Sequence, residues 1–303
     1  MQKNLPSSLL PGDAIGIIST ARAIGPEELQ PAIDIIESWG FSVVKGSNLH
    51  ARQNQFAGTD QQRLSDLQNM LDDPSIKAIL CARGGYGTAR IIDSIQFSGF
   101  KGSPKWIIGY SDITALHNHI HTNFGIPTLH ATMPVNFTKN SPEALESLRS
   151  VLKGKELPPY STAAHPLNRL GSASGTLIGG NLSIIYSLCG SPSRMETRGK
   201  ILFLEDLDEY LYHIDRMMLN LKRNGYLNGL SALVVGGMTD MNDNAIPFGK
   251  TAEEIIAEHV AEYSYPVLFG LPAGHIDDNR ALIMGANIAL DVTDEGGTFI
   301  QKW

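Results

Sequence analysis

A serine lies where a short apolar segment ends and a helical stretch begins. The apolar run Trp106–Gly109 is typical of a buried strand and leads through Tyr110 into Ser111. A serine on such a turn is lifted out of the sheet, and the N-terminus of the next helix offers it N–H groups and partial positive charge. This placement suits a nucleophile whose tetrahedral intermediate carries an oxyanion. Ser111 or Asp112 could instead only cap the helix, because Ser and Asp are common N-cap residues.

A second candidate is the glycine-rich loop Arg-Gly-Gly-Tyr-Gly at residues 83–87, directly after the apolar run Ile76–Cys81. Closely spaced glycines let a backbone approach a ligand and expose its N–H groups. The loop could form half of an oxyanion hole, an anion nest or only a tight turn, and it matches no phosphate-binding motif. In an open α/β sheet, this loop and Ser111 would both lie at the carboxyl edge of the strands, where ligands bind.

A serine nucleophile needs a base and an acid that orients it. Among the nine histidines, His275 lies in a Gly- and Pro-containing loop at residues 270–279, between two predicted strands. A histidine on such a loop is a good general-base candidate. Glu205 follows an apolar run at residues 201–204, and a carboxylate at the end of a buried strand must be paired or face a cleft. Glu205 could also be an acid at the start of a helix.

Other residues offer competing chemistry. His117 and His121 share a helix face and could bind a metal ion, but no carboxylate or cysteine stands beside them at a ligand spacing. Packing or solvated roles are therefore favoured, and no metal or other cofactor is expected. Cys81 is a rival nucleophile at a strand end, although nothing in the sequence stabilises its thiolate. We therefore interpret Cys81 as a small buried residue.

The elements that would carry these residues change character along the chain. In the first half, apolar strands alternate with amphipathic helices, which predicts a parallel sheet covered on both faces. Pro-, Ser- and Gly-rich sequence without periodicity follows, and strands predominate after it. We predict an α/β protein with a Rossmann-like N-terminal domain at residues 1–155, a linker at 156–174, and a smaller β-rich α+β domain at 175–303. The first domain holds Ser111, whereas the second holds Glu205 and His275.

Composition excludes several classes of protein. The chain has 303 residues, a net charge of −7 and no block of five like charges, which argues against a nucleic-acid binder or a polybasic membrane anchor. No apolar run approaches the ~20 residues of a membrane-spanning helix. The N-terminal sequence, which contains Pro6 and Pro11, does not resemble a signal peptide. Its two cysteines fit a reducing compartment, so a cytoplasmic protein is expected.

Several segments in order along nearly the whole chain resemble the LD-carboxypeptidase family (serine peptidase family S66). The pair Arg-Gly-Gly-Tyr-Gly and Gly-Tyr-Ser-Asp, at residues 83–87 and 109–112, is quite specific to that family. The other matching segments are residues 56–60 with Arg63, His130, and residues 179–182, 203–206, 214–216 and 274–275. One departure is Ile283, where the family usually has proline.

The resemblance implies a cytoplasmic, metal-free serine peptidase of murein recycling, commonly a homodimer. Such an enzyme removes the terminal D-Ala of a muropeptide tetrapeptide by cutting an amide between an L-centre and a D-residue. Transferred to this chain, the triad is Ser111 as nucleophile, His275 as general base and Glu205 as orienting acid. The oxyanion hole would be the backbone N–H groups of Gly85 and Asp112.

Three questions stay open at this stage. We hypothesise that Arg83 binds the substrate carboxylate, the alternative being a structural interdomain ion pair. Some members of the family instead hydrolyse peptidyl–nucleotide antibiotics and confer self-immunity, which requires an aromatic platform for the nucleobase. A protein of another class, a non-enzymatic Rossmann protein, would use residues 83–87 as an anion nest for a nucleotide.

Overall fold

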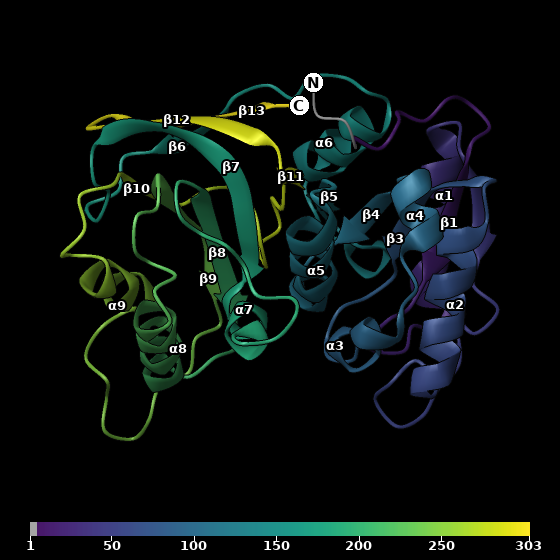
Figure 1. Cartoon of the computed structure of the whole chain (residues 1–303), viewed down its shortest axis with the longest axis horizontal. Helices are drawn as coiled ribbons and strands as arrows, with labels where there is room; N and C mark the ends of the chain where they lie inside the picture. The colour runs from purple at the N-terminus through teal and green to yellow at the C-terminus, as the bar shows by residue number, and fades with distance from the viewer. Residues whose placement is uncertain (1–4) are drawn as a thin grey trace.

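The computed structural model describes residues 5–303 and contains two sheets in two lobes (Figure 1). The first sheet has the order β11-β5-β4-β3-β1-β2, in which only β11 is antiparallel to its neighbour. Its strands are β1 (Ala14–Ile18), β2 (Ser42–Lys45), β3 (Ile76–Cys81), β4 (Trp106–Gly109), β5 (Thr128–His130) and β11 (Leu282–Met284). The loops after β1, β3 and β4 leave the carboxyl edge of this sheet, beside the place where strand order reverses, which is the usual ligand edge of such folds.

Helices cover both faces of the first sheet. One buried cluster joins β1 to α1 (Pro26–Ser38) and α6 (Pro142–Leu152), and another joins the opposite face to α2 (Asp60–Asp72) and α5 (Thr114–Phe124). Local sequence fixes the ends of these helices. Thr59 caps α2 by accepting a hydrogen bond from Gln62 N, while Gly40, with φ of +92°, follows α1 in the left-handed conformation that ends helices. Two short helices, α3 (Thr88–Ile91) and α4 (Ser98–Gly102), complete this lobe.

The second sheet has the order β10-β9-β8-β7-β12-β13-β6, with a parallel half from β10 to β7 and an antiparallel half from β7 to β6. Its strands are β6 (Tyr160–Ala163), β7 (Gly171–Asn181), β8 (Ile201–Leu207), β9 (Ala232–Thr239), β10 (Val267–Phe269), β12 (Asn287–Thr293) and β13 (Gly296–Lys302). A separate buried cluster lies under α7 (Leu182–Leu188), α8 (Leu211–Arg223) and α9 (Ala252–His259). Strands therefore predominate in this lobe, as the sequence predicts.

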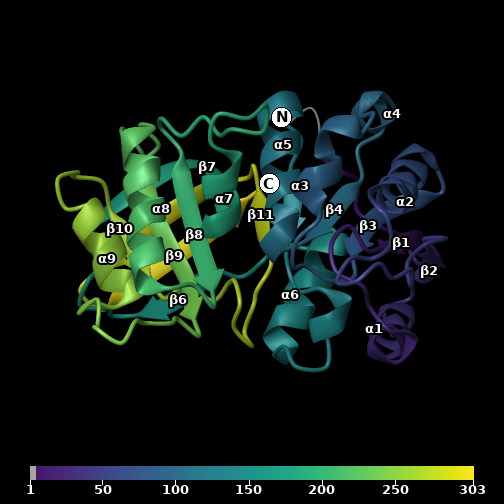
Figure 2. The same ribbon diagram turned by 90° about the horizontal axis from the view of Figure 1, so that it is seen from below.

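The two lobes share one core. The cluster under α1 and α6 continues without a break to Phe203, Val234 and Phe299 of the second sheet. Figures 1 and 2 show α5 and β11 between the lobes. Strand β11 comes from the second half of the chain but pairs with β5 of the first sheet, with Ile283 opposite Leu129. Ile283 also donates its backbone N–H to Gln301 Oε1 at 2.8 Å, a bond that the proline usual in the family would lack.

The expected α/β class, with a parallel first sheet and a β-rich second part, is confirmed. The division at 1–155, 156–174 and 175–303 stays a prediction. The stretch expected to be a linker includes β6 and the first residues of β7. Within residues 5–303, none of the helices is both long and apolar enough to span a bilayer.

Candidate active site

Ser111 occupies the turn between β4 and α5. Its φ of +62° lies in the left-handed region, which a residue other than glycine seldom adopts. Strain of this kind is held by the surrounding structure and is frequent at functional sites. No side chain caps the helical turns that begin at Ser111 and Thr114, and the Ser111 hydroxyl enters no hydrogen bond within residues 5–303. The hydroxyl is therefore not used as a helix cap.

The glycine-rich loop lies directly against this serine. A β-carbon added to Gly84 would come within 3.1 Å of Ser111 Oγ, so the loop backbone is in contact with the nucleophile candidate. The Asp112 side chain holds the same loop, since its Oδ2 accepts a hydrogen bond from Thr88 N at 2.8 Å. Burial raises the pKa of Asp112 despite that bond. Gly85 has a φ of +113° and packs against the Arg22 side chain, which a larger residue would displace.

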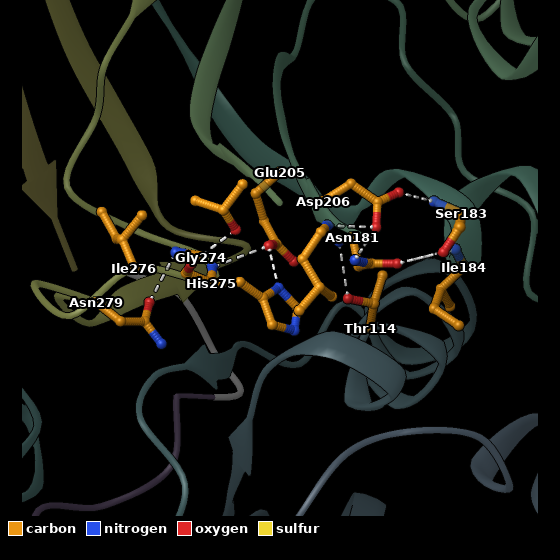
Figure 3. Close-up of polar contacts among 12 residues, drawn as sticks. Thr114, Asn181, Ser183, Ile184, Glu205, Asp206, Gly274, His275, Ile276 and Asn279 are labelled. Atoms are coloured by element: carbon orange, nitrogen blue, oxygen red, sulfur yellow. Dashed lines mark hydrogen bonds and ion pairs between the residues drawn. The ribbon is translucent and has the colours of Figure 1, made fainter. Parts of the chain in front are cut away.

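His275 and Glu205 form a short hydrogen-bonded pair (Figure 3). His275 Nδ1 lies 2.6 Å from Glu205 Oε2, and His275 N donates to the same oxygen at 3.2 Å. The Glu205 side chain is fully buried, whereas that of His275 is 12% exposed. Burial alone would lower the pKa of His275, but the attraction and hydrogen bond of Glu205 outweigh it and raise that pKa. Burial likewise opposes ionisation of Glu205, yet His275 keeps the pKa of Glu205 below its usual value.

Ser111 and His275 line one cavity of about 300 Å³ together with Arg83 and Gly85. Ser111 and Gly85 also line an adjacent cavity of about 290 Å³. Glu205 lies behind His275, out of the cavity. The structure thus brings together the side chains of Ser111 and His275 and the backbone of Gly85, with the buried Glu205 fixed to His275.

Comparisons with known proteins show the family of the chain. Residues 15–131 match the LD-carboxypeptidase N-terminal domain, and residues 174–290 match the LD-carboxypeptidase C-terminal domain. A probable murein peptide carboxypeptidase of Bacillus subtilis is 36% identical over 96% of this chain and 92% of its own length. The chain belongs to the LD-carboxypeptidase family.

Solved structures of this family have the same fold. The crystal structure of a muramoyltetrapeptide carboxypeptidase from Oxalobacter formigenes superimposes with a TM-score of 0.86 and 26% identity, over 96% of this chain and 99% of that one. A more distant relative is the microcin C7 self-immunity protein MccF of Escherichia coli, which is 24% identical over 99% of this chain and 96% of its own length. Both branches of the family foreseen from the sequence are therefore represented among its relatives.

In this LD-carboxypeptidase family member, a buried polar network connects the Glu205 strand to the nucleophile's helix (Figure 3). Asn181 Nδ2 donates to Asp206 Oδ1 at 2.9 Å, and Asn181 N donates to Thr114 Oγ1 at 3.0 Å. Burial, followed by repulsion from Glu205, raises the pKa of Asp206 to about 7. Sequence reasoning missed Thr114 and Asp206, although the adjacent acids Glu205 and Asp206 at the end of a buried strand could have indicated such a network.

The competing candidates have other roles. Both ring nitrogens of His117 are engaged, with Gly109 O at 2.9 Å and Thr128 Oγ1 at 2.8 Å, and burial lowers its pKa to about 3. His121 contacts Lys200 Nζ through Nε2 at 3.2 Å. Burial raises the pKa of the Cys81 thiol to about 12, which leaves it protonated. The packing interpretation of His117 and the buried interpretation of Cys81 are thus supported.

Arg83 lines the same cavity as Ser111 and also contacts Glu28 Oε1 at 3.3 Å. Glu28 is on α1, in the same lobe as Arg83. The alternative of an interdomain ion pair for Arg83 is therefore wrong. This contact leaves room for a ligand, because both side chains are partly exposed to solvent and such pairs are weak.

Proposed function

We propose that the protein is a serine LD-carboxypeptidase that removes the terminal D-Ala from murein tetrapeptides. The observation that carries this proposal is the His275–Glu205 pair, whose imidazole faces the same cavity as the strained and unbonded Ser111. Family membership and the relative named as a probable murein peptide carboxypeptidase support the substrate class. The scissile bond joins an L-centre to the D-residue, in keeping with the family resemblance.

The roles of the three side chains follow from their contacts. Glu205 is hydrogen-bonded to Nδ1 of His275, which leaves Nε2 free to act as the base. Nε2 takes the proton of Ser111 while Ser111 Oγ attacks the peptide carbonyl carbon. Glu205 fixes the tautomer and stabilises the imidazolium that forms. The imidazolium then gives its proton to the departing amine of D-Ala as the C–N bond breaks. Water, deprotonated by the same imidazole, hydrolyses the ester and regenerates the serine.

The backbone N–H groups of Gly85 and Asp112 are the proposed oxyanion hole. Support comes from the contact of the glycine loop with Ser111 and from the Asp112 carboxylate, which ties that loop to the nucleophile's turn. Donors that are already in place need no reorganisation as charge develops, and each is worth on the order of 3 kcal/mol. No metal ion or cofactor enters this scheme.

We also propose that Arg83 contributes to binding of the substrate carboxylate. Its position in the cavity beside the glycine loop supports this role. The corresponding test is kinetic: Arg83→Ala should raise KM for a tetrapeptide, and an unchanged KM would remove Arg83 from the binding site.

The peptidyl–nucleotide branch of the family has less support. An aromatic platform is needed for a nucleobase, yet the three tryptophans lie elsewhere. Trp106 is fully buried against Trp303, Trp39 packs on Phe137, and none of the three lines either cavity at Ser111. Tyr110 lines one of these cavities, but it is buried and its ring packs on that of His275. We accordingly favour the murein substrate.

We further propose a cytoplasmic homodimer that acts in murein recycling. The two free cysteines, Cys81 and Cys189, fit a reducing compartment, and the small peptide substrate would be a product of cell-wall turnover. Dimerisation rests on the family resemblance. Light scattering of the purified protein gives its mass directly, and a monomer at working concentration would remove that part of the proposal.

The decisive experiment measures the masses of the products after incubation with a murein tetrapeptide and with a control peptide that has an L-residue at its C-terminus. Release of alanine from the first peptide alone establishes both the reaction and its stereochemistry. A fluorophosphonate probe should label Ser111, and His275→Ala should abolish the labelling. Absence of labelling together with nucleotide binding would favour the non-enzymatic binder.

A further inference from the structure

The two cavities that meet at Ser111 carry opposite charge. Three cationic residues line the cavity that contains His275, namely Arg22, Arg83 and Lys139, and none of the described residues that line it is an acid. We call it the cationic cavity. The adjacent cavity, here the acidic cavity, is lined by Asp206, Asp208 and Glu209, with Arg22 at the junction of the two. The charge that lines the site therefore changes from positive in one cavity to negative in the other, with Ser111 between them.

The acids of the acidic cavity are already partnered. Asp206 accepts hydrogen bonds from Asn181 and Ser183, Asp208 accepts one from Asn242, and Glu209 pairs with His213 at 2.6 Å. Because the pKa of Asp206 is raised to about 7, Asp208 and Glu209 supply most of the negative charge at neutral pH, and they disfavour a carboxylate of the ligand on that side.

The cations differ in how free they are. Arg83 has Glu28 as a competing partner at 3.3 Å. Lys139 takes part in none of the ion pairs formed among residues 5–303, nor does Arg22. Arg22 packs along Gly85, so part of its side chain is used to cover the loop. Lys139 is the cation whose charge is the least committed to the protein itself.

The backbone next to Lys139 is fixed to the loop that carries His275. Asn140 Nδ2 donates to Asp277 O at 2.9 Å and to Ile276 O at 3.2 Å. Ser141 N donates to Asp277 O at 2.8 Å, and Lys139 N itself donates to Asn136 O at 2.9 Å. These bonds hold the base of the Lys139 side chain at a set position relative to the general base, although the side chain itself is exposed and free to reach a ligand.

We propose that Lys139 binds the free α-carboxylate of the residue that leaves, and so fixes the direction in which the peptide lies across Ser111. The departing D-residue occupies the cationic cavity, and the acyl part of the peptide extends towards the acidic cavity. An ammonium group on that part, such as the side-chain amine of a diamino acid, would meet favourable charge there. This inference rests on the proposed carboxypeptidase function. It adds the residue that makes the enzyme specific for a peptide with a free C-terminus.

The test compares a tetrapeptide that has a free C-terminal carboxylate with the same peptide as its C-terminal amide. Lys139→Met removes the charge and keeps most of the side-chain length, and Lys155→Met, at an exposed position outside both cavities, is the matched control. A hydrogen bond to a charged group contributes enough to change affinity about tenfold or more. We therefore expect Lys139→Met to raise KM for the acid about tenfold, to leave the amide much less affected, and so to reduce the acid-over-amide preference in kcat/KM.

Each other outcome contradicts the assignment in a distinguishable way. Equal losses on acid and amide in Lys139→Met would indicate a structural role, and an unchanged preference would show that Lys139 does not bind the carboxylate. A loss of the same size in Lys155→Met would show a general charge effect. If the unmodified protein releases neither alanine from the acid nor alaninamide from the amide, the proposed function is overturned, and the assignment with it.

Discussion

Gly274 and Glu205 are in direct contact, and the contact is possible only because Gly274 has no side chain. A β-carbon at Gly274 would lie 2.7 Å from Glu205 Cβ and 2.8 Å from its Oε2. Gly274 also has a φ of +105°, and its N–H donates a hydrogen bond to Asn279 Oδ1 at 2.8 Å. The neighbouring His275 can therefore place both its N–H and its Nδ1 on the same carboxylate oxygen.

Gly274→Ala should inactivate the enzyme more than it destabilises the fold. The added methyl displaces Glu205 and with it the imidazole, and a misplacement of about 1 Å can cost on the order of 100-fold in rate. Gly270→Ala is the matched control, because Gly270 also has a positive φ of +79° but no atom within 4 Å of the added carbon. Both variants strain the backbone at a positive φ, but only Gly274→Ala displaces Glu205. Measuring kcat and the melting temperature of both variants therefore separates the effect of strain from that of the displacement. Equal kcat losses in the two variants would contradict this explanation.

Glu205→Gln should lower kcat by a factor on the order of 10³–10⁴, because an amide can stabilise the wrong imidazole tautomer. The pH profile adds a sharper readout. The general base must be neutral, so activity rises with pH through the pKa of His275, which Glu205 raises above its usual 6.5. Without that carboxylate, burial is opposed by the weaker attraction of Asp206, so the pKa of His275 falls and the acidic limb of kcat/KM for the residual activity should move to lower pH.

The control for that experiment is Asp215→Asn, which removes a carboxylate from a different histidine, His259, at 2.9 Å. This pair lies between α8 and α9, and neither residue lines the cavities at Ser111. The acidic limb should stay in place in Asp215→Asn. A limb that stays in place in Glu205→Gln as well would mean that His275 is not the group that titrates.

Thr114→Val should lower turnover before it unfolds either lobe. Val has nearly the same shape as Thr but leaves the buried Asn181 N–H without its acceptor, which costs about 1–3 kcal/mol. The affected bond joins β7 to the helix that follows Ser111, so its loss loosens the contact that brings the nucleophile to the base. Thr122→Val, on the same helix, loses an exposed bond to Arg194 O and should retain kcat. A kcat of Thr114→Val equal to that of Thr122→Val would show that this bond does not position the site.

The sequence predicts elements best where a single signal dominates. Strands β3 and β4 are apolar runs except for Lys77 in β3, and both are predicted with the bounds that the structure has. Strands β5 and β6 are short and contain threonine, serine or histidine, so their strand character depends on pairing, which includes the distant strands β11 and β13. Helix α7 was also missed, because its seven residues give too little periodicity for a prediction.

The candidate site divides in the same way. Ser111 and His275 could be found because they follow or lie between apolar strands, where side chains emerge at a sheet edge. Glu205 could be found because it follows the apolar residues 201–204, although the structure extends β8 past it to Leu207. Lys139 and Thr114 could not be found, since their roles depend on contacts between distant segments. The bond from Asn140 to Asp277, for example, spans 137 residues. The raised pKa of Asp206 likewise depends on burial and on the charge of Glu205, which the sequence places next to it without showing which way either side chain points.

Cys81→Ala should keep most of the activity. Cys81 is fully buried at the end of β3, and burial raises the pKa of its thiol to about 12, so almost no thiolate exists at neutral pH. The substitution removes only the packing contacts of the thiol, so we expect a lower melting temperature with a nearly unchanged kcat. Thiol-alkylating reagents should accordingly leave the native enzyme active, whereas a fluorophosphonate should inactivate both it and Cys81→Ala at the same rate. Inactivation by alkylation that Cys81→Ala resists would instead place the nucleophile on sulfur and remove Ser111 from that role.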